Sequence, residues 1–443
     1  MTSDLLTHLA QMSVPRYTSY PTAADFNDAV GPGEQAAWLR RLDPAQAVSI
    51  YLHVPYCRQL CHYCGCHAKA VHRMEPVEDY RKALEAEIAL VSSYFSHRLK
   101  IGRIAWGGGT PSILGETGLV SVLAALQRHF DFEESYEHSI ELDPRTFDRE
   151  FCRSLARLGI NRASLGVQDL NSRVQAAIGR VQPEEQVRAA VKNLHDAGIA
   201  DLNFDLIYGL PHQTEASLLA TCQSVADLQP ARIAFYGYAH LPSRRANQRL
   251  IDPVHLPKPD VRLGQAATIA DFFTGEGYQA IGIDHFARPD DPLAIAAREG
   301  RLHRNFQGYT DDNRPNLLGF GCSSISRLPG GFVQSESGID AYKRRITGGV
   351  LPAKRGHAFV EGDNDRARII ERLMCDFRVE IDRSNTRYAD EFALLRSFAS
   401  NGLVDVKDHS ISMTETGRPF VRIVAALFDR FRSDGIGQFS TSV

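Results

Sequence analysis

This chain of 443 residues has few cysteines, a small net charge and no long apolar run. No apolar stretch approaches the roughly 18–20 residues that a membrane-spanning helix needs, so no membrane span is predicted. Residues 1–22 lack the basic stretch and apolar core of a secretory signal, which predicts a cytoplasmic protein without disulfides. The formal net charge is only −3, which argues against bulk binding of nucleic acid.

The composition is that of a globular protein with a large core. Apolar residues make up 43% of the chain and charged residues 23%. From Val48 to about Gly277, six strand-like segments alternate with helix-like segments, which predicts parallel strands joined by crossover helices. An open doubly wound sheet and a barrel both fit this alternation. Because an eight-unit barrel needs two more units, we favour a partial six-unit (β/α) barrel.

The segments on either side of this alternation have a different pattern. Residues 1–45 read as an N-terminal arm, with the extended stretch PRYTSYPT and the short helix GEQAAWLRRL. Residues 278–326 predict one strand followed by loops rich in glycine and polar residues. From Asp363, three helical patterns and a hairpin at 403–414 predict a mainly helical, winged-helix-like domain whose last helix covers 417–433. The predicted domains are 1–45, 46–362 and 363–443.

Half of the eight cysteines lie in one short loop, at C-x-x-x-C-x-x-C-x-C spacing, after the first predicted strand. In α/β barrels the chemistry is carried by such loops. Three of these thiolates can hold three irons of a cubane cluster and leave the fourth iron open to a small molecule. Alternatively, a zinc ion takes four cysteines including Cys66, or has His62 or His67 as its fourth ligand. The usual zinc frame of two separated C-x-x-C pairs is absent.

Polar groups and glycines recur at the ends of the following strands. The stretch WGGGTP, at Trp106–Pro111, either brings the backbone close to a ligand or forms a mere tight turn. It does not match the dinucleotide-binding fingerprint. Glu141, Gln168 and Asp205 end the next strands, where a single polar group is usually solvated.

Taken together, these motifs resemble known families. The three-cysteine motif with an aromatic residue before its last cysteine, and GGGTP one strand later, resemble the radical S-adenosylmethionine (SAM) superfamily. The motifs PRYTSYPT, YLHVPYC, CGC, GGGTP, ELDPR, LGVQD, DLIYGLP, YAHLP, DHFARPDD and LHRNFQGYT occur in this order. In that order they resemble the oxygen-independent coproporphyrinogen III oxidases, from about residue 13 to the C-terminus.

This resemblance implies a cytoplasmic, monomeric enzyme of haem biosynthesis that uses a reducing electron donor. It implies a 4Fe–4S cluster held by Cys57, Cys61 and Cys64, with one SAM on the open iron. Reductive cleavage of SAM gives a 5′-deoxyadenosyl radical, which takes a hydrogen atom from a propionate of coproporphyrinogen III. Loss of CO2 and an electron leaves a vinyl group. Two propionates react in this way, and the product is protoporphyrinogen IX.

The resemblance also implies two SAM molecules and the residues that contact them. The first SAM is implied to contact Tyr51, Gly108, Glu141 and Ile325. The second is implied to contact Tyr63, Gly109, Thr110, Gln168, Arg180, Asp205 and Ala239. The residue types agree with these roles, because carboxylates accept hydrogen bonds from ammonium and ribose groups and a guanidinium can grip a carboxylate as a fork.

Two roles stay open at this point. Cys66 is either structural or takes part in electron or hydrogen transfer. The substrate carries four carboxylates, and its predicted contacts are Arg16 and Tyr20 in the arm, with Arg288 and Arg304. Each arginine is equally compatible with a surface salt bridge. The arm either packs its rings on the macrocycle or merely covers one end of the barrel.

Three other functions fit the sequence less well. A haem chaperone of the same superfamily resembles the cysteine loop but lacks the PRYTSYPT arm and typically the CGC extension. An iron–sulfur redox sensor leaves GGGTP, Glu141 and Gln168 without a purpose. DNA binding by the C-terminal domain is disfavoured because its helices are only mildly basic, and a cover over the active site fits better.

Overall fold

A computed structural model describes residues 3–381, 386–432 and 439–442. Contacts divide the chain into two compact units. Unit 1 comprises Met1–Asp25, Leu206–Asn313 and Val360–Val443; unit 2 comprises Phe26–Asp205 and Arg314–Phe359. The boundaries of the three predicted domains differ from those of the two units, and the predicted domains stay a prediction. None of the helices in the described ranges is long and apolar enough to cross a bilayer.

Unit 2 is built on a mixed sheet. Its strands are β1 (Val48–Val54), β4 (Lys100–Gly108), β5 (Asp131–Leu142), β6 (Arg162–Gln168), β7 (Asp201–Tyr208, shared with unit 1), β13 (Leu317–Phe320), β14 (Ile325–Leu328), β15 (Gly331–Ser335) and β16 (Ala353–Ala358). They occur in the order β16-β15-β14-β13-β1-β4-β5-β6-β7. β1, β4, β5 and β6 pair in parallel, as predicted, and β13 also joins β1 in parallel. β13 to β16 pair antiparallel.

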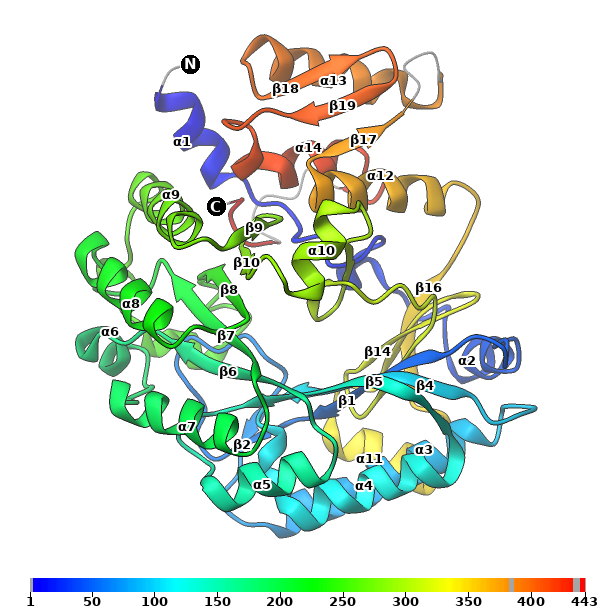
Figure 1. The fold of residues 1–443 in the computed structure, drawn as a ribbon. Coiled ribbons are helices and arrows are strands. Elements are labelled where there is room, and N and C mark those ends of the chain that lie inside the picture. Colours follow the sequence, from blue (N-terminus) through cyan, green and yellow to red (C-terminus); the bar gives the residue numbers. More distant parts are fainter. Residues whose placement is uncertain (1–2, 382–385, 433–438, 443) are drawn as a thin grey trace. The chain divides into compact units, whose positions relative to one another are not determined.

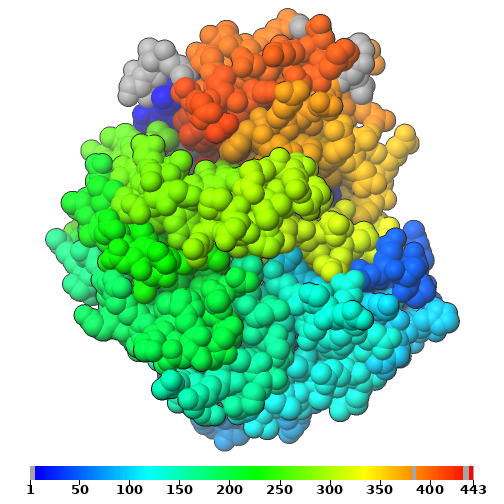
Figure 2. All heavy atoms as spheres, viewed as in Figure 1, coloured from blue at the N-terminus to red at the C-terminus, as the bar shows by residue number. Residues whose placement is uncertain are grey.

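Helices cover one side of this sheet (Figure 1). The helices of unit 2 are α2 (Pro32–Leu39), α3 (Glu75–Ser92), α4 (Gly115–His129), α5 (Arg149–Arg157), α6 (Ser172–Ala177), α7 (Glu184–Asp196) and α11 (Ile339–Thr347). In α3, Val77, Tyr80, Leu84, Ile88 and Val91 recur every three or four residues and are all buried, as an amphipathic helix requires. The cyan part of the surface, which includes α4, is continuous in Figure 2.

Unit 1 continues the alternation and adds the C-terminal region. Its elements before residue 313 are α1 (Ser3–Gln11), α8 (Glu215–Asp227), β8 (Arg232–Gly237), α9 (Pro259–Gly275), β9 (Gln279–Ile281), β10 (His285–Ala287), α10 (Pro292–Arg298), β11 (His303–Asn305) and β12 (Gly308–Thr310). All six predicted strand–helix units are therefore present, from β1 with α3 to β8 with α9. The prediction of alternating strands and helices is confirmed.

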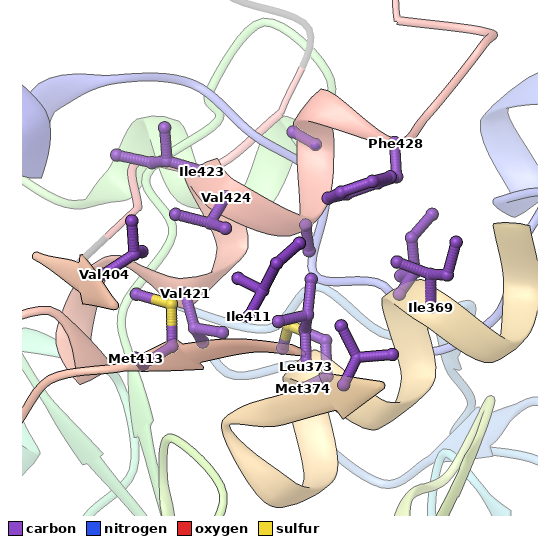
Figure 3. Close-up of a cluster of buried hydrophobic side chains, with 14 of the residues drawn as sticks. Ile369, Leu373, Met374, Val404, Ile411, Met413, Val421, Ile423, Val424 and Phe428 are labelled. Carbon is purple, nitrogen blue, oxygen red and sulfur yellow. The ribbon is translucent and has the colours of Figure 1, made fainter. Parts of the chain in front are cut away.

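The C-terminal region has its own small sheet. Its elements are α12 (Asp363–Asp376), β17 (Arg378–Glu380), α13 (Ala389–Ser400), β18 (Val404–Lys407), β19 (Ser410–Met413) and α14 (Val421–Leu427). β19 pairs with both β17 and β18, so the predicted hairpin is confirmed. Side chains from α12, the hairpin and α14 form one hydrophobic cluster (Figure 3). The last helix is shorter than predicted, and Ser433 lies outside the described residues.

One sequence prediction was wrong, and one element was not predicted. Residues 278–326 form several short strands and α10 instead of one strand and loops, and β13 lies beside β1 in the sheet. Strands of three or four residues are too short to show an alternating pattern, and pairing with neighbours distant in sequence decides them. Residues 3–11, which were read as part of the arm, form helix α1.

The extended part of the arm is tied to unit 1 by its backbone. Arg422 donates to the carbonyl oxygens of Val14 and Pro15, the latter at 2.9 Å. Arg304 donates to the carbonyl oxygens of Arg16 and Tyr17, both at 3.1 Å. Buried guanidinium groups therefore hydrogen-bond to backbone carbonyls of the arm that are not paired with a β-strand.

Candidate active site

The cysteine loop starts from a two-strand link. β2 (Tyr56–Cys57) pairs in parallel with β3 (Lys69–Ala70), so the two ends of the loop lie side by side. The backbone N–H of Val71 donates to the carbonyl of Cys57 at 2.9 Å. In the middle of the loop, the N–H of His62 donates to the carbonyl of Ile178 at 2.9 Å. Hydrogen bonds at both ends and at its centre thus position the loop at the carboxyl end of β1.

The four thiols differ in exposure. Cys61 is buried, Cys57 and Cys64 are half-buried, and Cys66 is exposed. The hydroxyl of Thr110 donates to the Cys57 sulfur at 3.4 Å. Burial raises the pKa of Cys57 to about 11, although this hydrogen bond acts in the opposite direction. The Cys66 thiol hydrogen-bonds to Cys64, which, with burial by surrounding atoms, raises the pKa of Cys66 well above its ordinary value.

Two guanidinium groups approach the buried thiol. Arg180 Nη1 lies 3.5 Å and Arg145 Nη2 lies 3.9 Å from the Cys61 sulfur. Both arginines pair with Asp143, at 3.2 Å and 2.7 Å respectively. Burial by itself would raise the pKa of Asp143, but the hydrogen bonds and charges of the two arginines lower it. The carboxylate therefore stays ionised and aligns both cations beside Cys61.

Asp143 and Arg145 were missed from the sequence as site residues. Both belong to the ELDPR motif at the end of β5, but only Glu141 was selected from it. An acidic and a basic residue two positions apart, directly after a strand, were the available signal. Their contact with Cys61 across the loop became visible only in the fold.

The glycines of WGGGTP are required by close packing against the protein itself. A Cβ on Gly107 would lie 2.7 Å from Glu141 Oε1, and one on Gly109 would lie 2.5 Å from the carbonyl oxygen of Tyr56. Gly108 has a φ of 111°, and a Cβ there would lie 2.7 Å from the His53 ring. Its N–H donates to Glu141 Oε2 at 3.1 Å. The glycine strip therefore lets Glu141, His53 and the cysteine loop converge on one strand end.

The predicted contacts of the first SAM lie on adjacent strands. Tyr51 on β1 is in register with Gly319 on β13, and a Cβ on Gly319 would lie 2.6 Å from the carbonyl of Ile325 on β14. The Tyr51 hydroxyl hydrogen-bonds to His53 Nδ1 at 3.0 Å. Crowding by protein atoms and repulsion from Asp205 raise the pKa of Glu141 to about 7, although water still reaches its side chain.

Three predicted contacts of the second SAM form a neighbouring group. Gln168 has a φ of 65°, an unusual value outside glycine that turns its side chain at the end of β6. A Cβ on Gly166 would lie 2.8 Å from Gln168 Nε2 and 2.9 Å from Arg180 Nη2. Asp205, at the end of β7 in unit 2, accepts a hydrogen bond from Ser164 at 2.7 Å. Of the predicted SAM contacts, only Ala239, after β8, belongs to unit 1.

Comparisons with known proteins agree with this geometry. The model of the radical SAM superfamily matches residues 51–225. An oxygen-independent coproporphyrinogen III oxidase of Bradyrhizobium diazoefficiens is 42% identical, covering 98% of both chains. The enzyme of the same name from Escherichia coli is 39% identical, covering 95% of this chain and 93% of the relative. The chain belongs to the oxygen-independent coproporphyrinogen III oxidase family.

The fold of this family is confirmed by a solved structure. Coproporphyrinogen III oxidase from Escherichia coli, which is described as a radical SAM enzyme, has a TM-score of 0.90 and 37% identity. It covers 95% of this chain, and this chain covers all of it. The partial six-unit barrel with its arm and C-terminal helical region is thus the fold of a radical SAM oxidase.

The thiols fit the 4Fe–4S cluster that a radical SAM enzyme uses together with SAM. Among the described side chains, no group of three histidines, cysteines or carboxylates converges on one metal ion. A cubane needs no such point, because each cysteine takes its own iron. His62 Nδ1 and His67 Nε2 hydrogen-bond to the carbonyls of Ala177 and Ser337, at 3.2 Å and 2.6 Å. Neither ring is arranged as the fourth ligand that the zinc interpretation needed.

The predicted substrate contacts all belong to unit 1. Tyr20 lies in the hydrophobic cluster, and its hydroxyl accepts a hydrogen bond from the N–H of Arg430 at 3.2 Å. Arg288 is exposed after β10. Arg304 donates to the arm and stacks on the Tyr309 ring at 4.1 Å. Arg16 donates to the carbonyl of Gly237 at 2.6 Å. Contact of these four residues with substrate stays a prediction.

Proposed function

We propose that this chain catalyses the anaerobic oxidative decarboxylation of two propionate side chains of coproporphyrinogen III. The products are two vinyl groups, and thus protoporphyrinogen IX, within haem biosynthesis. The observation that carries this proposal is the cysteine loop beside the glycine strip and Glu141, in a chain that matches oxidases of this name over nearly its whole length.

Cys57, Cys61 and Cys64 would hold the cluster. When bound, the cluster and SAM supply the radical that takes hydrogen from the substrate. The protein supplies placement and charge. The guanidiniums of Arg145 and Arg180, aligned by Asp143, lie beside the Cys61 sulfur. The Glu141 carboxylate already accepts the N–H of Gly108 at 3.1 Å and offers its remaining lone pairs to the ammonium or ribose of SAM.

A second SAM would use the neighbouring group of Gln168, Arg180 and Asp205. This proposal is supported by the closeness of Gln168 and Arg180 around Gly166, one strand from Asp205. Equilibrium dialysis of the reconstituted protein should then find two SAM per chain. Gln168→Ala should keep the cluster but bind close to one SAM at the same concentration. Two equivalents in the variant would remove Gln168 from the second site.

The decisive experiment is an anaerobic incubation of the reconstituted protein with coproporphyrinogen III, SAM and a low-potential chemical reductant. We expect a product with two vinyl groups and release of CO2, detected by chromatography and mass spectrometry. Cys61→Ala, carried through the same reconstitution, is the matched control. Haem or porphyrin binding without vinyl formation in the wild type would instead favour the chaperone.

Three further expectations stay predictions. They are the cytoplasmic location, the monomeric state, and the reducing electron donor, whose identity the sequence leaves open.

A further inference from the structure

Arg262 in the first turn of α9 is an arginine without a counter-charge. Its Nε is buried, and the described part of the chain provides it with no hydrogen-bond or ion-pair partner. The guanidinium instead lies over the Tyr208 ring, 6.0 Å from its centre. A buried and unpaired cation is costly, because protein atoms replace its water without returning the hydrogen bonds. An anionic ligand beside Arg262 would offset this cost.

A second guanidinium meets Arg262 at the end of β8. Arg16 Nη2 donates to the carbonyl of Gly237 at 2.6 Å. A Cβ on Gly237 would lie 3.2 Å from Arg262 Nη2 and 2.9 Å from the Tyr208 hydroxyl. At Gly209 a Cβ would lie 3.1 Å from Arg262 Nε. Gly209 and Gly237 thus leave room for the Arg262 side chain against β7 and β8. Arg16 hydrogen-bonds to the carbonyl of Gly237 as well.

The surroundings within unit 1 keep this place positive. The charges of Arg16, Arg422 and Asp284 act on Tyr208, the ring on which Arg262 lies. Arg422 donates to a carbonyl of the arm, and Asp284 hydrogen-bonds to His285 at 2.7 Å. Burial and the nearby charge of Arg16 lower the pKa of Arg262. The positive charges of Arg262 and Arg16 are therefore available to a ligand.

We propose that Arg262 and Arg16 form a carboxylate-binding site for one propionate of the tetrapyrrole, a site that rests on the proposed function and deepens it. A propionate there accepts hydrogen bonds from both guanidiniums, and Arg262 grips it as a planar fork. Arg16 brings the arm into substrate binding through its charge. The site binds and orients the substrate and takes no part in the radical chemistry.

The test is the affinity for coproporphyrin III, the fluorescent oxidised counterpart that carries the same four carboxylates. Binding is titrated anaerobically with wild type, Arg262→Gln, Arg262→Lys and the matched control Arg249→Gln, an exposed arginine of unit 1. We expect Arg262→Gln to raise the Kd about tenfold to a hundredfold and Arg249→Gln to leave it unchanged. The tetramethyl ester should bind wild type and Arg262→Gln equally, since it has no carboxylate to lose.

Unchanged coproporphyrin affinity in Arg262→Gln overturns the proposal, and so does an equal loss of affinity for the ester. If Arg262→Gln melts at a lower temperature than wild type, Arg262→Lys decides. Arg262→Lys keeps the positive charge but cannot grip a carboxylate with two parallel hydrogen bonds. If it melts like wild type and has a raised Kd for coproporphyrin III, the site is supported. If its Kd equals that of wild type, the proposal is overturned. Arg262-dependent affinity in a protein that forms no vinyl product would refute the proposed function and leave the carboxylate site standing.

Discussion

At the scale of single residues, charge around the thiols decides what the cysteine loop can hold. Asp143 aligns Arg145 and Arg180 beside Cys61, and Thr110 donates to Cys57. Burial nevertheless outweighs the Thr110 hydrogen bond and raises the pKa of Cys57 to about 11. Cys66 is the exposed thiol of the four, and in the described part of the chain it has no pair of arginines like the one beside Cys61.

Each cluster ligand should be indispensable. Cys61→Ala should lose the iron–sulfur absorbance and reductive SAM cleavage, because one iron loses its ligand. Cys66→Ala should keep both, since three thiols account for the cluster. Cys152→Ala, a change at a buried thiol of α5, is the control for reconstitution. Iron and sulfide content should be measured beside the absorbance; full content in Cys61→Ala would refute the ligand assignment.

Glu87 on α3 is a buried acid outside the cluster region. It accepts hydrogen bonds from the Tyr342 hydroxyl at 2.5 Å and the Gly321 N–H at 2.7 Å, while its other oxygen has no partner. Burial raises the pKa of Glu87 from its ordinary 4.5 to about 7. The folded protein therefore keeps a proton that the unfolded chain releases.

This shift predicts a pH-dependent stability. Below about pH 4.5 both states hold the proton and Glu87 contributes nothing; from there to about pH 7 stability falls as pH rises. The cost above pH 7 is at most about 3 kcal/mol. Glu87→Gln should therefore be more stable than wild type at pH 8, with a difference that shrinks toward pH 5. Chemical denaturation at both pH values measures it; a constant difference would contradict the shift.

At the scale of elements, the arm is part of a core. Leu9, Val14, Tyr17 and Tyr20 belong to the hydrophobic cluster of unit 1, and the Tyr17 hydroxyl donates to Asp429 at 2.9 Å. A structural role of the arm thereby gains support, since Arg422 and Arg304 hold its backbone. Its charge remains available through Arg16.

Removing residues 1–25 should therefore do two things. Unit 1 loses apolar cover, and the buried Arg422 loses two of its acceptors, the carbonyls of Val14 and Pro15, so the melting temperature should drop by several degrees. The cluster should still form, because its ligands lie in unit 2, but no vinyl product should appear. Tyr17→Phe is the mild control, with a cost of about 1 kcal/mol. A truncated chain that decarboxylates normally would show that the arm is dispensable.

At the scale of the whole molecule, each unit buries apolar side chains of its own. The chain has only two tryptophans, and both Trp38 and Trp106 are buried in unit 2. Tryptophan fluorescence thus reports on unit 2, while circular dichroism reports on helices of both. The two signals can separate the units without any label.

A loss of stability in unit 1 should then split the two signals. In the variant without residues 1–25, the urea midpoint by circular dichroism should fall below the midpoint by tryptophan fluorescence. In the wild type the gap should be smaller. Coincident midpoints in the truncated protein would mean that the units unfold together.

Much of the site could be predicted because its information is local. Cysteine spacing, the GGGTP stretch and polar residues at strand ends are visible along the chain, and parallel strands bring their carboxyl ends to one edge. The glycines also pack against Glu141, His53 and Tyr56, which the sequence did not predict. That contact joins three strands and leaves no trace in the pattern of any one of them.

The sequence by itself determined the family, the six strand–helix units and the three thiols, because periodicity and spacing are properties of neighbouring residues. Only the tertiary structure decided which charges meet. It brought Arg145 and Arg180 to Cys61, placed β13 beside β1, and left Arg262 unpaired beside Arg16. These contacts join residues tens to hundreds of positions apart, and burial, which makes an unpaired charge costly, exists only once the chain has folded.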